Sequence, residues 1–134
     1  MSRKLRNNKV KGECAEIEFL LKVHRLGFIV SRPWGDSAPY DFILETKRRL
    51  LRVQVKSAWT KGKRAYRLSA HRSLGRGYLP GQIDVVVAYV APEKTWYVIP
   101  FRALGGRRSM YLFPENPNSK GRLEKFRNRW DLFR

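Results

Sequence analysis

Two short apolar segments, residues 40–44 and 51–57, constrain the fold of this 134-residue chain more than any other feature. Each has the length and the β-branched or aromatic content of a strand. Side chains alternate between the faces of a strand, so Gln54 and Lys56 point to one face and the valines beside them to the other. A tight, charged turn near 46–49 joins the segments, which are therefore expected to be neighbouring strands of one sheet.

Asp41 is expected inside the first of these strands, on the face opposite Tyr40 and Phe42. Burial of an unpaired carboxylate is costly, so a carboxylate at such a position needs a partner. The alternative is an edge strand from which Asp41 faces solvent. Composition alone leaves a functional and a structural role for Asp41 equally supported.

Apolar periodicity and turn residues predict the remaining elements. The order is helix, three strands, a linking region, two strands and a helix, which indicates an α/β sandwich around a small mixed sheet. The expected elements are a helix over 12–26, strands at 28–30, 40–44 and 51–57, a further strand at 66–69, strands at 83–90 and 96–99, a short helix over 101–104 and a C-terminal helix over 123–132. The 83–90 segment is apolar apart from Asp84 and is expected to be a strand buried on both faces.

The length corresponds to one domain, residues 1–134, with a basic and mobile arm at residues 1–9. Lys and Arg number 29 against 11 Asp and Glu, which gives a formal charge of +18. Such an excess attracts polyanions, so nucleic acid is the leading partner. A ribosomal-type RNA binder is the alternative for a chain of this charge, and a membrane-surface protein is disfavoured because the charge is spread along the whole sequence.

The chain has one cysteine, Cys14, and two histidines, His24 and His71. It therefore offers no disulfide framework and no cysteine-based zinc site. No run of about 18 apolar residues is present to span a membrane, and no apolar stretch follows the basic N-terminus as in a secretory signal. These features favour an intracellular, cytoplasmic protein.

Glu16 falls on the apolar stripe of the first predicted helix. The stripe is defined by Ala15, Phe19, Val23 and Leu26 and is widened by Ile17, Leu20 and Leu21. Glu16 is therefore expected to face the core, although a carboxylate near a helix start is also favoured by the helix dipole. Asp36 is the competing acid; it follows Gly35 in a loop at 32–39, where aspartate commonly caps a turn.

Asp41 in one strand and the Gln54-x-Lys56 pair in the next resemble the core of the PD-(D/E)XK nuclease superfamily. The stretch from Lys11 to Glu16 also resembles the first helix of archaeal Holliday-junction resolvases. The order and spacing of the motifs is similar to that of PD-(D/E)XK endonucleases encoded in bacterial group I introns, which also have Gln in the third motif position. The segments that carry this resemblance are 11–16, 32–35, 40–43, 53–57, 96–100 and 127–131.

The resemblance implies a restriction-endonuclease-like fold and metal-assisted hydrolysis of a DNA phosphodiester. Glu16 and Asp41 would bind Mg²⁺, for which Mn²⁺ can substitute, together with the Gln54 amide and the backbone carbonyl of Val55. Lys56 would position the attacking water. Gln54 stands where the superfamily usually has an acid, so another carboxylate is needed, and Glu16 is the best candidate to supply it.

Several arginines and one tryptophan are candidate contacts to double-stranded DNA: Arg32, Trp34, Arg67, Arg72 and Arg76, with Arg52, Arg107 and Arg108 as further phosphate contacts. For Trp34, as for Tyr40 and Tyr66, packing in the core or a loop is favoured over stacking against bases. Cutting both strands of a duplex takes two active sites, so a homo-oligomer, dimer or tetramer, is expected. The alternatives to a homing-type endonuclease are a junction resolvase and a catalytically inactive DNA-binding module, which Gln54 keeps open.

Overall fold

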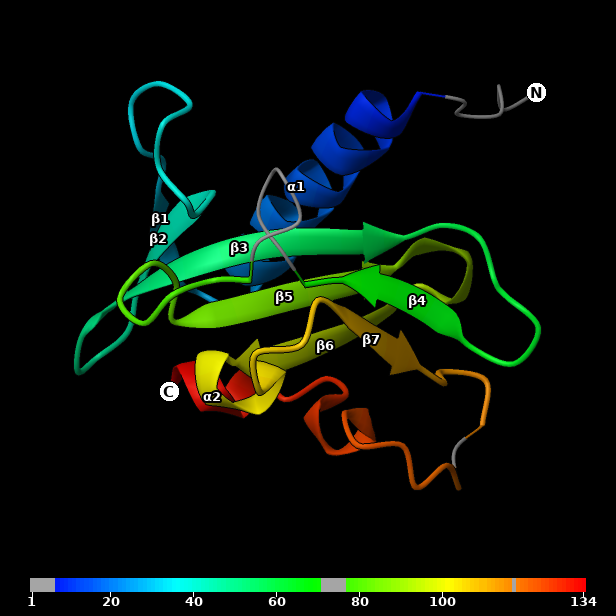
Figure 1. Ribbon diagram of the computed structural model, residues 1–134. Helices are drawn as coiled ribbons and strands as arrows, with labels where there is room; N and C mark the ends of the chain where they lie inside the picture. Colours follow the sequence, from blue (N-terminus) through cyan, green and yellow to red (C-terminus); the bar gives the residue numbers. More distant parts are fainter. Residues whose placement is uncertain (1–6, 71–76, 117) are drawn as a thin grey trace.

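The computed structural model describes residues 7–70, 77–116 and 118–134. Its centre is a five-stranded sheet in the order β1-β2-β3-β5-β6, in which β3 and β5 are parallel and the other neighbours antiparallel (Figure 1). The strands are β1 (Ile29–Ser31), β2 (Phe42–Glu45), β3 (Leu50–Ala58), β5 (Val85–Val90) and β6 (Thr95–Pro100). β4 (Tyr66–Ser69) and β7 (Ser109–Leu112) form a second, antiparallel sheet. The expected mixed sheet is confirmed.

Both faces of the large sheet are covered. Helix α1 (Asn8–Arg25) packs on one face, where Phe19 stacks on Phe42 of β2 with ring centroids 5.4 Å apart. The small sheet and the short helix α2 (Phe101–Leu104) pack on the other face. Strand β5 alternates between the two cores, with Val87 on the α1 side and Val86 on the small-sheet side. The prediction of a strand buried on both faces is therefore confirmed.

Helix α1 begins earlier than the sequence periodicity predicts. The Asn7 side chain accepts a hydrogen bond from the Lys9 amide at 2.8 Å, so it caps the helix and Asn8 is its first residue. Residues 8 and 9 thus belong to the helix, and residues 1–6 of the predicted arm lie outside the described residues. The helix ends at Arg25, one residue before the predicted end, with Leu26 as its C-cap. Gly27, with a φ of +90°, follows the cap and stops the helix as predicted.

The apolar stripe of α1 is narrower than expected. Ala15, Phe19 and Val23 are buried against the sheet, as predicted. Ile17 and Leu21, which were expected to widen that stripe, are 64% and 45% exposed, and Leu20 is also exposed. The prediction was wrong for these three residues because one helix face of limited width suffices to cover the sheet. Helix α1 therefore has a second apolar face that points away from the core.

The predicted C-terminal helix over 123–132 is wrong. This segment contains two short 3₁₀ helices, η3 (Glu124–Phe126) and η4 (Trp130–Phe133), separated by Asn128 with a left-handed φ of 52°. The Asn128 amide donates to the Trp96 carbonyl at 2.9 Å, which ties the segment to edge strand β6. Leu123 packs in the core on the small-sheet side and Trp130 in the core on the α1 side. A chain that passes around a sheet edge in this way cannot remain one straight helix.

Strand β7 was not predicted. Its burial alternates, with Met110 and Leu112 buried and Tyr111 between them exposed, but the strand is short and follows Gly105 and Gly106. Its register with β4 sets Tyr66 opposite Leu112. The long-range pairing with β4, rather than local propensity, therefore makes this segment a strand. The predicted short helix over 101–104 is confirmed as α2.

A buried polar cluster holds the C-terminal segment against β6. Glu124 accepts hydrogen bonds from the Tyr97 hydroxyl at 2.9 Å and from the Phe113 amide at 3.1 Å, and it pairs with Arg127. The Glu124 side chain is 8% exposed. Burial and then the Glu124 hydrogen bond raise the pKa of Tyr97 well above its ordinary value, so the hydroxyl remains a donor. Glu124 thus satisfies donors from three separate segments.

We expect Glu124→Ala to lower the free energy of unfolding by about 2–3 kcal/mol, because it leaves buried donors without an acceptor. Glu18→Ala, an exposed position on α1, is the matched control and should change stability by less than about 0.5 kcal/mol. Urea denaturation followed by circular dichroism measures both. Equal effects of the two variants would contradict a structural role for the cluster.

Candidate active site

The candidate site is built at the edge of β3, where β2 begins. Asp41 directly precedes β2, and the β2–β3 register runs only as far as Phe42 opposite Val53. The Asp41 amide donates to the Val53 carbonyl at 2.9 Å, and the Asp41 carboxylate accepts from the Val55 amide at 2.8 Å. The Asp41 side chain thus accepts the Val55 hydrogen bond that a backbone carbonyl would accept if β2 continued alongside β3.

This arrangement corrects the expected position of Asp41. The residue does not lie inside the strand, and Tyr40 and Phe42 do not share a face: Phe42 packs in the core on the α1 side and Tyr40 against the opposite core. The strict alternation of a strand does not extend back through Asp41, because β2 starts only at Phe42. The carboxylate has a partner, as its partial burial requires.

Strand β3 shows the alternation that the sequence predicts. Val53 and Val55 are buried on the α1 side, while Gln54 and Lys56 are half-buried and point to the other face. Since the N–H and C=O of one strand residue point to the same edge, the Val55 carbonyl faces the side on which Asp41 lies. The edge of β3 is therefore where groups from both faces of the sheet can meet.

Glu16 reaches this edge from helix α1. Partial burial raises the pKa of Glu16, and the nearby charge of Asp41 raises it further. Arg32, at the start of the loop between β1 and β2, acts in the opposite direction and lowers the pKa of Glu16. The structure therefore brings two carboxylates from separate elements into electrostatic contact, with an arginine beside them.

Asp41 and Lys56 perturb each other in the same place. Burial raises the pKa of Asp41, whereas the Val55 amide, Lys56 and Arg32 oppose this shift. Burial lowers the pKa of Lys56, and the Asp41 charge opposes that shift. The Lys56 ammonium also lies 5.6 Å from the centre of the Tyr78 ring. A lysine with a lowered pKa loses its proton more readily and is better suited to assist a water molecule.

The donor set at this edge fits a hard divalent cation only if neutral oxygens contribute. Within the described ranges, no three His, Cys, Asp or Glu side chains form a group that could hold a metal ion. Glu16 and Asp41 would supply two carboxylates, and the Val55 carbonyl, which faces the Asp41 side of β3, and the Gln54 amide would supply neutral oxygens. Two partly buried carboxylates repel each other, and a cation between them would relieve this cost.

The predicted DNA contacts have different surroundings. Trp34 is fully exposed in the loop at 32–39, so the packing alternative was wrong for this residue. Figure 1 shows that this loop and the N-terminal half of α1 extend beyond the sheet in the same direction. Arg67 is exposed and donates to the Ser109 hydroxyl. Arg72 and Arg76 lie outside the described residues.

Two arginines have roles that the sequence did not indicate. Arg52, a predicted phosphate contact, instead forms a two-bond ion pair with Asp84, with both N–O distances 3.0 Å. Arg32, predicted only to contact phosphate, lies close enough to Glu16 and Asp41 to affect the pKa of each carboxylate. Tyr78 beneath Lys56 was not predicted either, because no local pattern connects residues so far apart in sequence.

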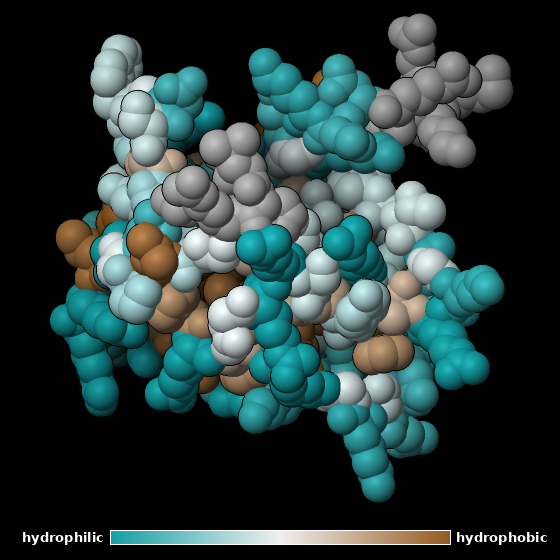
Figure 2. Space-filling view, in the orientation of Figure 1, coloured by the Kyte–Doolittle hydropathy of each residue, from teal (hydrophilic) through white to brown (hydrophobic). Residues whose placement is uncertain are grey.

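Much of the molecular surface is hydrophilic. Figure 2 shows hydrophilic side chains over most of the face that it presents. The formal charge of +18 makes this a surface suited to a polyanion. No helix in the described part of the chain has the length and apolar character needed to cross a bilayer.

Two comparisons identify the class of protein that this fold and site define. The family model for PD-(D/E)XK endonucleases matches residues 6–133, so the chain belongs to the PD-(D/E)XK endonuclease family. The structure is similar to that of a bacterial homing endonuclease, I-Ssp6803I, with a TM-score of 0.81 and 27% sequence identity over 96% of this chain and 91% of that chain. No curated protein sequence matches the chain significantly. The predicted restriction-endonuclease-like α/β fold and nuclease class are confirmed.

The raised pKa of Glu16 gives a test of the site without metal or DNA. The pKa of Glu16 is higher in the folded protein than its ordinary value of 4.5. The stability that such a carboxyl contributes is therefore fully present below pH 4.5 and is lost as the pH rises through the folded pKa. We therefore expect Glu16→Gln to raise the melting temperature at neutral pH and to give no gain well below pH 4.5. Thermal melts with a chelator at several pH values measure this.

Glu18→Gln, which alters an exposed carboxylate of the same helix, is the matched control. It should leave the melting temperature nearly unchanged across the pH range. A Glu16→Gln variant that melts at or below the wild-type temperature at neutral pH would show that Glu16 is not held partly buried beside Asp41.

Proposed function

We propose that this protein is a divalent-metal-dependent endodeoxyribonuclease that hydrolyses phosphodiester bonds in double-stranded DNA. The observation that carries the proposal is the meeting of Glu16, Asp41 and Lys56 at the open edge of β3. Their pKa values are shifted by burial, and Asp41 affects the pKa of both of the others. Shifted titratable groups that converge from separate elements are typical of catalytic sites.

Each residue has a distinct role in this proposal. Glu16 and Asp41 would hold Mg²⁺ or Mn²⁺, with the Gln54 amide oxygen and the Val55 carbonyl as further ligands. Bound there, the metal would stabilise charge on the scissile phosphate and the leaving oxygen. The Val55 amide fixes the orientation of the Asp41 carboxylate. Lys56 would orient the attacking water and accept its proton, which its lowered pKa favours.

Loop and surface residues would bind the DNA. Arg32 lies next to both carboxylates and could hold a phosphate beside them. Trp34, two residues after Arg32 in the same loop, is fully exposed and offers a flat apolar surface to a base. Arg67, Arg72 and Arg76 remain proposed phosphate contacts on the same grounds of charge.

The similarity to a homing endonuclease favours a site-specific, homing-type enzyme. Gln54 in the third motif position also favours this version over a junction resolvase. Because one such site cuts one strand, we propose that the active form is a homo-oligomer. The alternative that remains is an inactive DNA-binding module on the same fold, which Gln54 alone supports.

Asp41→Asn and Lys56→Ala should each reduce cleavage by at least about 100-fold, because they remove a metal ligand and the group that serves the water. Asparagine keeps an oxygen acceptor for the Val55 amide, so loss of activity would not reflect loss of the fold. Asp36→Ala, an exposed acid of the neighbouring loop, should keep near wild-type activity. The assay is cleavage of a complex DNA pool with Mg²⁺ or Mn²⁺, followed by sequencing of the ends.

DNA binding by these variants should stay within a few-fold of wild type in a filter or gel-shift assay. Tight DNA binding without cleavage under any divalent metal would favour the inactive module. Loss of activity in Asp36→Ala equal to that in Asp41→Asn would show that the carboxylates are wrongly assigned.

A second test compares the two unusual ligands. Glu16→Gln should slow cleavage at least tenfold more than Gln54→Ala, because the first change leaves one carboxylate for the metal and the second leaves two. Gln54→Glu should be tolerated and should lower the Mg²⁺ concentration needed for half-maximal rate, since it adds a carboxylate. Rates measured against Mg²⁺ concentration decide between these outcomes. Wild-type rates for Glu16→Gln would remove Glu16 from the site.

A further inference from the structure

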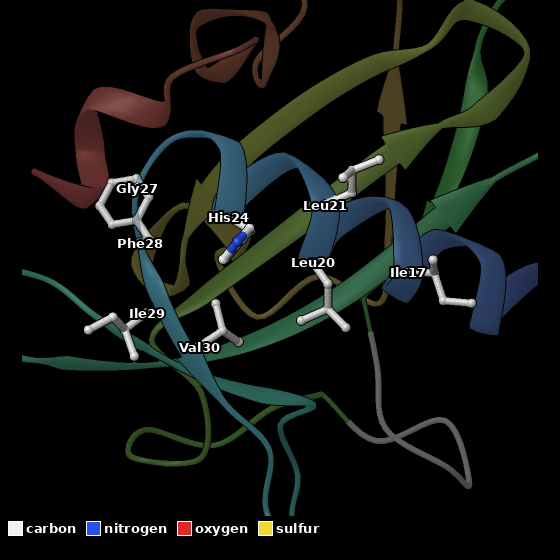
Figure 3. Close-up of a pocket in the computed structure, with 8 residues that line it drawn as sticks. All are labelled: Ile17, Leu20, Leu21, His24, Gly27, Phe28, Ile29 and Val30. Carbon is white, nitrogen blue, oxygen red and sulfur yellow. The ribbon is translucent and has the colours of Figure 1, made fainter.

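Two hollows in the surface differ in the charge of their walls. The groove between α1 and β1 has a volume of about 650 Å³, and Figure 3 shows Leu20 and His24 of α1 beside Ile29 and Val30 of β1 across it. None of the described residues that line this groove is Asp, Glu, Lys or Arg. A smaller pocket of about 280 Å³ lies beside β7, and two arginines and two aromatic residues are part of its wall. Only the smaller pocket therefore combines fixed positive charge with aromatic surface.

Strand β7 supplies the polar and aromatic part of the pocket wall. Ser109 and Tyr111 lie on the outer face of β7, because the residues that alternate with them are buried. Tyr111 is 55% exposed. Its register partner on β4 is Arg67, which donates to the Ser109 hydroxyl at 2.8 and 3.1 Å. This face thus presents a flat aromatic ring beside polar and cationic groups.

Arg107 and Arg122 form the cationic part of the wall. Arg107 follows a turn in which Gly105 and Gly106 have left-handed φ values of 59° and 69°, a conformation that other residues rarely adopt. The Arg122 guanidinium donates a hydrogen bond to the Ala103 carbonyl, which restricts its orientation. A segment before β7 and a segment after it therefore bring two arginines to one pocket.

No carboxylate balances these two arginines. Neither forms an ion pair within the described part of the chain, where the ion pairs are made by other residues. Burial lowers the pKa of Arg122, and the charge of Arg107 lowers it further, so the two guanidinium groups repel each other. A phosphate between them would remove this repulsion and would accept the paired N–H groups that arginine offers.

The rest of the wall is apolar and suits the flat surface of a base. Phe113, Met110 and Leu123 line the pocket together with Tyr111. A contact to the phosphate backbone of a duplex needs cationic and polar groups only. An aromatic and apolar wall beside a cationic one favours a nucleotide whose base is unpaired and can stack on a side chain.

We infer that this pocket binds one nucleoside phosphate unit, with its phosphate between Arg107 and Arg122 and its base against Tyr111 and Phe113. The unit would come from a free nucleotide or from a single-stranded stretch of DNA, since the bases of an intact duplex are paired and stacked. None of the described residues that line the pocket belongs to the candidate active site. The inference therefore adds a separate binding site and does not depend on the proposed cleavage.

Calorimetric titration of the full chain, with a chelator and moderate salt, tests the pocket without cleavage. Deoxyadenosine monophosphate should bind at least about tenfold more tightly than inorganic phosphate, because the base adds stacking on an aromatic side chain. Tyr111→Ala should remove most of this advantage and should change phosphate binding by less than about twofold. Tyr111 is largely exposed, so this variant should keep its fold.

Arg107→Ala should weaken the binding of both ligands at least about fivefold, because it removes one of the two guanidinium groups that hold the phosphate. Arg48→Ala removes the same charge from the β2–β3 turn, which contributes nothing to the pocket wall, and is the matched control. A nucleotide that binds wild type no better than phosphate does, or an Arg107→Ala variant that binds both ligands as Arg48→Ala does, would overturn the inference.

Fluorescence anisotropy with labelled DNA distinguishes the two sources of the nucleotide. If the source is single-stranded DNA, Tyr111→Ala should weaken binding of a single strand of about eight deoxyadenosines at least about fivefold, and binding of a duplex of that length by less than about twofold. If both DNAs bind Tyr111→Ala as they bind wild type, and only deoxyadenosine monophosphate binds it more weakly, the source is a free nucleotide. Equal weakening for the single strand and the duplex would overturn the inference in favour of a contact to the DNA backbone.

Discussion

The hydrogen bond between the Asp41 carboxylate and the Val55 amide is the interaction on which the candidate site depends. It forms just before β2 begins, where β3 continues without a strand partner on that side. A side-chain carboxylate therefore accepts the hydrogen bond that a backbone carbonyl would otherwise accept. The bond orients the carboxylate and keeps it beside the next residue of β3, Lys56. A backbone–backbone bond at the same position would complete the ladder equally well but would leave no charged group at this edge.

The rest of the fold places other groups around that bond. β3 is held in the middle of the large sheet by a parallel partner on one side and β2 on the other, with a core on each face. Helix α1 packs on one of these faces and brings Glu16 close enough for Asp41 to affect its pKa, while Lys56 approaches Asp41 from the other face. Partial burial of these charged groups strengthens their interactions, because less water is present to screen them.

Helix α1 combines three surfaces in eighteen residues. One face buries Phe19 and Val23 in the core, a flank carries Glu16, and the outer face exposes Ile17 and Leu21. The first face fixes the helix on the sheet and thereby positions the other two.

Local sequence determined much of this protein. The alternation of valines with Gln54 and Lys56 predicted which β3 side chains are buried, the apolar run at 83–90 predicted a strand covered on both faces, and Gly27 predicted the end of α1. The order of the motifs predicted the family. These features follow from the geometry of single strands and helices, which a short window of sequence determines.

Tertiary structure decided the rest, because those outcomes depend on contacts between distant segments. Only the packing shows that Ile17 and Leu21 face outward, that 123–132 wraps around β6 as two short turns, that Arg52 pairs with Asp84, and that Arg32 and Tyr78 join the site. Helical spacing alone does not say which of two apolar faces meets the sheet, and an arginine pairs with whichever carboxylate the fold places beside it.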